Sequence, residues 1–271
     1  MTLIIEAPTA TKFPPEARGS VVVCGSHGGR YPAYLAAQAG LRAVIFNDAG
    51  VGLDNAGIAS LALLGQGGMA AATVSHATAR IGESADMLAR GVISHANEPA
   101  RRVGVEPGMH CRLAAERLRE ADLVHVRIPP SEESRTVREL PGAVRRLVLI
   151  DSAAMVEPAD AGHIIVTGSH GGLVGGNPAL ALRVDGFAAV FNDAGIGIEE
   201  AGIARLPALD QRNIAAFTVA ASSAHIGEAI STFEDGLISA VNASAAKLGA
   251  APGLRAKDVL TAWALGSPVR Q

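Results

Sequence analysis

The sequence predicts an α/β fold that is built twice within one chain of 271 residues. Two segments recur along it. VVVCGSHGG at residues 21–29 returns as IIVTGSHGG at 164–172, and AVIFNDAGVGLDNAGIA at 43–59 returns as AAVFNDAGIGIEEAGIA at 188–204, with eleven of the seventeen positions identical. Two copies of so long a unit indicate an internal duplication rather than a solenoid. We therefore expect two units related by a pseudo-twofold axis, each with a mostly parallel sheet covered by helices.

The repeat also predicts the domain organisation. Equivalent residues lie 145 positions apart through most of the repeat, and each copy closes on a Pro-Gly pair. The segment between the copies is arginine-rich, and within it residues 112–120 are expected to form a solvent-facing helix. Its simplest role is a solvated connector, with a lid or a dimer arm as alternatives. The expected boundaries are unit one at 1–109, the insert at 110–145, unit two at 146–254 and a tail at 255–271.

Apolar runs, glycines and capping residues predict the elements of the first unit. Short apolar runs that end in a turn are typical of buried strands, and Ala-rich segments that end at glycine are typical of helices. Asp54 is expected to cap one helix and Asn97 another. In chain order we expect strand 21–24, helix 32–38, strand 43–46, helix 55–65, strand 71–74, helix 80–90, strand 92–94 and a last helix that begins near residue 97.

The Gly-Ser-His-Gly-Gly loops are the first candidate functional motif. Each follows a predicted strand, and parallel strands end at one edge of a sheet, where such folds bind ligands. Glycines allow a sharp turn and bring backbone N–H groups near an anion or an oxyanion. The alternative is a tight turn with a capping serine and an exposed histidine. The candidate residues are Gly25, Ser26, His27, Gly28 and Gly29, with Gly168, Ser169, His170, Gly171 and Gly172 in the second copy.

The Asn-Asp-Ala-Gly loops are the second candidate motif. Asp48 and Asp193 each follow a strand, where an aspartate can act as a general base, bind a metal or orient a histidine. Asn47 and Asn192 precede them and are candidates for substrate binding. The alternative is an Asx-turn that closes the strand, which is a common use of Asn, Asp and Gly.

The two copies differ at positions that bear on function. His76 corresponds to Ala221, and Arg80 corresponds to His225. An arginine near a helix start can bind a carboxylate with two hydrogen bonds, so Arg80 and His225 join the substrate-binding candidates. Simple drift between the copies is the alternative, especially for His76.

Composition excludes several classes of function. Apolar residues make up 49% and charged residues 18%, which is typical of a well-packed globular protein. A net charge of −3 and 3% aromatic residues argue against nucleic-acid binding. No apolar run approaches the roughly 20 residues of a membrane span. Two cysteines, Cys24 and Cys111, are too few for a disulfide framework or a zinc site. We expect a cytoplasmic homo-oligomer whose partner is a small-molecule substrate, possibly anionic.

The residues at the predicted site favour a hydrolase of a small amide, ester or ring carbonyl compound. Ser26 or Ser169 would attack, or His27 or His170 would activate water, while the glycine loops stabilise the oxyanion. A cofactor-independent isomerase, racemase or lyase with one acid/base from each half is the first alternative, and a non-catalytic anion or metabolite binding protein is the second. No cofactor is expected, although a divalent metal is possible at His27, Asp48, His170 and Asp193.

The layout of the chain resembles that of the aspartate/glutamate racemases, which work between two pseudo-symmetric halves. That resemblance concerns the arrangement of the halves only. The racemases use a cysteine in each half, whereas the matching loops here read Asn-Asp-Ala-Gly. No catalytic residue is therefore carried over from them.

Overall fold

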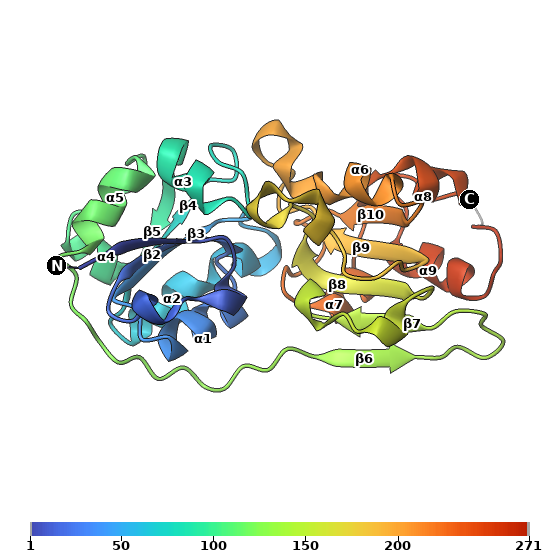
Figure 1. Cartoon of the computed structure of the whole chain (residues 1–271), viewed down its shortest axis with the longest axis horizontal. Coiled ribbons are helices and arrows are strands. Elements are labelled where there is room, and N and C mark those ends of the chain that lie inside the picture. The colour runs from blue at the N-terminus through green and yellow to red at the C-terminus, as the bar shows by residue number, and fades with distance from the viewer. Residues whose placement is uncertain (1, 270–271) are drawn as a thin grey trace.

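The computed structural model describes residues 2–269, which form two similar α/β halves side by side (Figure 1). The first sheet has the order β1-β2-β3-β4-β5, and the second has β11-β10-β9-β8-β7-β6. In the first sheet β1 to β4 run parallel and β5 is antiparallel. In the second sheet β7 to β10 run parallel and β11 is antiparallel, and β6 adds a further antiparallel strand beside β7. Apart from β6, the strand order is therefore the same in both halves, which confirms the predicted α/β fold with two similar units.

The strands are short and strongly apolar, because most of them are covered on both faces. Their bounds in the first sheet are β1 Ile4–Ala7, β2 Val21–His27, β3 Ala43–Asn47, β4 Ala70–Val74 and β5 Ile93–Ala96. In the second sheet they are β6 Arg135–Arg138, β7 Leu147–Ile150, β8 Ile164–His170, β9 Ala188–Asn192, β10 Ala215–Val219 and β11 Ile238–Val241. All five residues of β3, β4, β9 and β10 are buried, as expected for central parallel strands.

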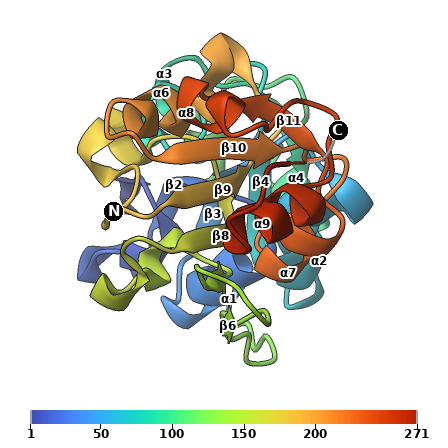
Figure 2. The same cartoon turned by 90° about the vertical axis from the view of Figure 1, so that its right-hand side faces the viewer.

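Helices cover both faces of each sheet, as Figure 1 and the end-on view of the second half in Figure 2 show. Alternate residues of β2 point to opposite faces: Val23 packs with α3 and α5, whereas Val22 packs with α1 and α2. The helices of the first half are α1 Arg30–Gln38, α2 Ala59–Gln66, α3 Ser84–Arg90, α4 Glu98–Arg102 and α5 Cys111–Leu118. Those of the second half are α6 Arg205–Asp210, α7 Ala229–Glu234, α8 Ala243–Lys247 and α9 Ala256–Ala264.

The structural repeat continues beyond the Pro-Gly pairs. Helix α5 follows the first pair and α9 follows the second, 145 residues later, and both helices belong to their hydrophobic cores. The helix expected at 112–120 is present as α5, but it is not wholly solvent-facing, because Cys111, Ala114, Ala115 and Leu118 form a buried stripe on one face. The segment without a counterpart is the extended chain 122–134, which we call the strap, together with β6.

The halves differ after the Gly-Ser-His-Gly-Gly loop. In the first half the loop leads into the nine-residue helix α1. In the second half it leads into two short 3-10 turns, Val174–Gly176 and Pro178–Leu180. Gly175 and Gly176 have left-handed backbone there, with φ of 61° and 66°, which interrupts a regular helix. Within residues 2–269 no helix is long and apolar enough to cross a membrane.

Asp54 does not have its predicted capping role. Asp54 and Asn55 adopt left-handed φ values of 49° and 59° inside the 3-10 segment Leu53–Ile58, and regular α-helix begins only at Ala59. Asn97 is the predicted cap and accepts a hydrogen bond from the Ala100 N–H, and Asn242 does the same for Ala245. The capping prediction therefore holds for α4 and fails for α2.

Candidate active site

The carboxyl edges of the two sheets face each other and form the seam between the halves (Figure 1). Two equivalent backbone hydrogen bonds cross it: Leu53 N–H donates to Ala221 C=O over 2.8 Å, and Ile198 N–H donates to His76 C=O over 2.9 Å. At the centre, a Cβ on Gly50 would lie 2.7 Å from the Cα of Gly195. The loops can approach so closely only because both residues are glycine.

A cavity of about 730 Å³ opens on this seam. Ser26 and His27 of the first half line it together with Ser169 and His170 of the second. The loops that follow β1 and β7, residues 8–12 and 151–154, line it as well. Both copies of the Ser-His pair therefore share one space that is large enough for a small metabolite.

The two imidazoles are held in the same tautomer. The Gly29 N–H donates to Nδ1 of His27 over 3.2 Å, and the Gly172 N–H donates to Nδ1 of His170 over 3.2 Å. Because Nδ1 accepts, the proton of each neutral ring lies on Nε2. Burial lowers the pKa of His27 to about 4. Burial, followed by the charges of Arg205 and His27, holds the pKa of His170 well below its usual value. Both rings are therefore neutral N–H donors at neutral pH.

The two serines hold the neighbouring loops in place. The Ala10 N–H donates to Oγ of Ser26 over 2.9 Å, and the Ala153 N–H donates to Oγ of Ser169 over 2.9 Å. Among residues 2–269 neither hydroxyl is hydrogen-bonded to an imidazole. The structure therefore lacks the Ser–His contact that activates a serine nucleophile.

Asp48 and Asp193 lie outside the cavity lining, and their carboxylates bind backbone. Oδ1 of Asp48 accepts from the N–H groups of Gly50 and His76, over 3.2 and 2.9 Å. Oδ1 of Asp193 accepts from Gly195 and Ala221, over 2.9 Å each. Both side chains are buried. This arrangement is the Asx-turn that the sequence offered as the alternative interpretation.

The asparagines before them are also structural. Oδ1 of Asn47 accepts from the Ala49 N–H over 2.9 Å, and Oδ1 of Asn192 accepts from Ala194 over 2.9 Å. Their amides donate to carbonyls 32 residues further along the chain. Within the described part of the chain no group of three or more His, Cys, Asp or Glu is arranged to hold a metal ion. The possible metal set at His27, Asp48, His170 and Asp193 is thus not assembled.

The loop glycines allow close packing between loops, and none of the six lines the cavity. A Cβ on Gly25 would lie 2.7 Å from the Gly82 carbonyl carbon, and one on Gly171 would lie 2.4 Å from the Gly202 oxygen. Similar close contacts surround the other four loop glycines, each with a heavy atom at 2.8 Å or less: Gly28, Gly29, Gly168 and Gly172.

His76 pairs with Asp48 at the centre of the seam. Its Nδ1 lies 2.8 Å from Oδ1 of Asp48, which raises the pKa of His76 and lowers that of Asp48. The ring packs against Gly195 of the other half. Ala221 takes the equivalent place in the second copy, so this ion pair exists on one side only.

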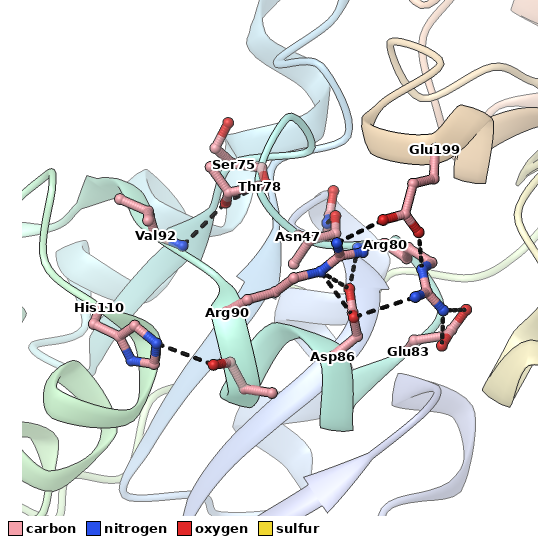
Figure 3. A network of polar contacts seen from close by, with 12 residues as sticks. Asn47, Ser75, Thr78, Arg80, Glu83, Asp86, Arg90, Val92, His110 and Glu199 are labelled. Carbon is pink, nitrogen blue, oxygen red and sulfur yellow. Dashed lines mark hydrogen bonds and ion pairs between the residues drawn. The ribbon is translucent and has the colours of Figure 1, made fainter.

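Arg80 and His225 occupy equivalent places in two different surroundings. His225 lines the large cavity, with Nε2 2.9 Å from Oδ2 of Asp54. Arg80 lies across the pseudo-twofold axis, where its Nε donates to Glu199 over 2.8 Å (Figure 3). The Arg80 guanidinium also contacts Glu83 over 3.1 Å. Arg80 is therefore engaged with the protein's own carboxylates.

The lining residues that the sequence analysis missed include Tyr31 on α1, Glu133 near the end of the strap, and Arg205 at the start of α6. Arg205 is 4% exposed, and its Nε donates to the Gly172 carbonyl over 2.9 Å. Burial lowers its pKa to about 10. Arg205 is equivalent to Ser60 of the first copy, so comparison of the two copies could have singled out Arg205. Glu133 lies in the unduplicated segment, where self-comparison is uninformative.

Comparison of the chain with protein-family models, with curated proteins and with solved structures found no match. The chemistry open to this chain is therefore set by the cavity, its two neutral imidazoles and the carboxylates around them.

Proposed function

We propose that this chain is an enzyme that hydrolyses a small amide, ester or ring carbonyl compound in the seam cavity. The observation that carries the proposal is the pair of equivalent imidazoles, His27 and His170, both with Nδ1 blocked by a backbone N–H. Each ring offers an Nε2–H donor to a substrate oxygen. Fixed donors of this kind polarise a carbonyl and stabilise the oxyanion that forms when a nucleophile attacks it.

The same observation argues against a two-base isomerase or racemase. Such an enzyme needs a proton acceptor on each face of the substrate carbon. A neutral ring with Nδ1 occupied and Nε2 protonated has no free lone pair for that proton. His27 and His170 thus suit carbonyl activation better than proton abstraction from carbon.

Water, rather than a serine, is the nucleophile in this proposal. The hydroxyls of Ser26 and Ser169 accept hydrogen bonds from loop N–H groups and have no imidazole partner among the described residues. The buried thiol of Cys24 is no substitute, because burial raises its pKa to about 12. A water molecule bound at the carbonyl carbon needs neither a free serine hydroxyl nor an ionised thiol.

The test is a hydrolysis screen with matched histidine variants. Purified protein is incubated with p-nitrophenyl acetate, small primary amides, lactams and cyclic imides, and product release is followed. His27→Ala and His170→Ala should each lower turnover by about 10²–10³-fold, as expected for the loss of one oxyanion donor. His125→Ala, which removes an exposed strap imidazole, serves as the control. Unchanged turnover combined with a large loss of stability would make the two histidines structural, and ligand binding without turnover would indicate a binding protein.

A further inference from the structure

The strap crosses from one half to the other (Figure 1). Three of its last residues, Ser131, Glu132 and Glu133, line the cavity. The strap continues into β6, which pairs antiparallel with β7. Asp151 fixes the junction: its Oδ2 accepts from the Ser134 N–H over 2.7 Å, and its Oδ1 accepts from the Ala229 N–H over 2.9 Å. Glu133, the residue just before this anchor, is therefore held at a defined place in the cavity wall.

Glu133 lies where three segments meet. It is half-buried and shares the cavity lining with Tyr31 of α1 and with Asp151 and Ser152 of the loop after β7. Burial and the nearby Asp151 carboxylate raise the pKa of Glu133 to about 7, while the Ser152 hydroxyl opposes this. Burial, then Glu133, also raises the pKa of Tyr31. The other charged or titratable groups that line the cavity, besides His27 and His170, are Lys12, Arg30, Asp54, Glu132, Arg183, Arg205, His225 and Glu228.

We propose that Glu133 is the general base that activates the attacking water, and that the strap exists in part to deliver it to the cavity. This inference rests on the proposed hydrolysis. The Glu133 carboxylate removes a proton from water as the water oxygen bonds to the carbonyl carbon. The carbonyl π electrons move to the oxygen, which the Nε2–H donors of His27 and His170 stabilise. The carbonyl then re-forms, and the carboxylic acid returns its proton to the departing nitrogen or oxygen.

This assignment gives the cavity complementary groups from three parts of the chain. One neutral donor comes from each half, and the titrating carboxyl comes from the strap. A general base works best when its pKa lies near the working pH, and Glu133 meets that condition. Asp151 does not compete for the role, because both of its oxygens already accept backbone N–H groups.

The experiment measures kcat/KM for p-nitrophenyl acetate, or for the best compound of the screen, from pH 5 to 9 after subtraction of the uncatalysed rate. Wild-type activity should rise tenfold per pH unit and level off above about 7, where Glu133 is ionised. Glu133→Gln should lower the plateau by about 10²–10⁴-fold and abolish the rise. Glu133→Asp should retain the rise at lower activity. Glu139→Gln removes an exposed carboxylate elsewhere in the insert and should match the wild type.

The outcomes separate this inference from the function on which it rests. If wild type is active and the histidine variants are impaired while Glu133→Gln keeps the wild-type pH profile, the hydrolase stands and Glu133 is not its base. A loss of activity in Glu133→Gln with the pH-dependent rise intact would likewise reduce Glu133 to a positioning role. If wild type hydrolyses none of the compounds, the proposed function fails and this inference fails with it.

Discussion

Two equivalent clefts flank the centre of the seam and differ in size, and we call the larger one the open cleft and the smaller one the closed cleft. On the open side, His225 contacts Asp54 of the first half over 2.9 Å and Glu228 over 3.7 Å, and these three residues line part of the 730 Å³ cavity. On the closed side, Arg80 and its neighbours leave a cavity of about 370 Å³. There Glu199 receives hydrogen bonds from both Arg80 and Arg90, so carboxylates and guanidinium groups of the protein occupy the space (Figure 3).

The segment after the Gly-Ser-His-Gly-Gly loop accounts for this difference. The 3-10 turns of the second half approach the closed cleft so closely that Gly175 N–H donates to Gly82 C=O over 2.8 Å. A Cβ on Gly82 would lie 2.2 Å from the Leu173 oxygen. On the open side, the nearest atom to a Cβ on Gly227 is a ring carbon of His27 at 3.5 Å. Equivalent loops therefore lie in different surroundings because different elements follow them, a helix in the first half and two 3-10 turns in the second.

The largest expected effect concerns the two equivalent glycines. Gly227→Ala should lower the free energy of unfolding by about 1–2 kcal/mol, because its left-handed backbone disfavours a side chain. Gly82→Ala should lower the free energy of unfolding by the same amount for its backbone, and the clash of the new Cβ with the Leu173 oxygen should lower it by about 1–3 kcal/mol more. Chemical denaturation of both variants measures the difference. Equal destabilisation would show that the closed cleft is not closely packed at this point.

A second prediction uses the equivalent histidines. The folded-state pKa of His27 is lowered to about 4, so its neutral form stabilises the fold fully above the unfolded pKa of roughly 6.5. As pH falls from 6.5 toward 4, the unfolded state binds the proton more readily, and up to about 3 kcal/mol of stability is lost. His27→Gln should flatten this dependence, and His170→Gln should do so as well, because His170 shifts in the same direction.

Urea denaturation between pH 4.5 and 7.5 checks this second prediction. The quantity to compare is the difference between each variant and wild type, since other titrating groups cancel in it. His125→Ala provides the control. A wild-type pH dependence that survives both glutamine variants would mean that neither imidazole is held neutral by the fold.

The smallest expected effect concerns the ion pairs of the closed cleft. Glu199→Gln should lower Tm more than Asp54→Asn, because Glu199 joins two arginines at 2.8 and 2.7 Å, whereas within residues 2–269 Asp54 pairs with His225 alone. Both sites are solvent-exposed, so the difference should shrink as salt is added. Thermal melts at low and high ionic strength measure it. A larger effect of Asp54→Asn would contradict the idea that the closed cleft fastens the halves together.

Much of the fold was predictable from local patterns. The repeat predicted two similar units, and strand-exit motifs predicted which loops meet at the carboxyl edges. The buried stripe of α5 was also present in the sequence as apolar residues at helical spacing, although small residues such as Ala114 make it inconspicuous. Asp54 was different. Its left-handed backbone belongs to a loop that hydrogen-bonds across the seam through Leu53, a contact 168 residues away in sequence, from position 53 to 221.

The site was predictable only in part, because it also depends on contacts between residues that are far apart in the sequence. Ser26, His27 and their second-half equivalents line the cavity, but their hydrogen-bond partners decide what they can do, and these come from other loops. The perturbed pKa of Glu133 depends on burial between segments of both halves, which no local pattern encodes. Asp48 shows the converse: its contacts with Gly50 and His76 follow from turn chemistry that the sequence offered as the alternative.

The pseudo-twofold seam has a consequence for how such a molecule can change. In a homodimer of identical subunits, every substitution appears on both sides of the axis, so filling one cleft fills the other. Here positions 80 and 225 are encoded separately and can change independently, and they hold arginine and histidine. Joining the units in one chain releases each side from the other's constraints. One side of the axis can then hold the two halves together through ion pairs, while the equivalent side remains free to receive a ligand.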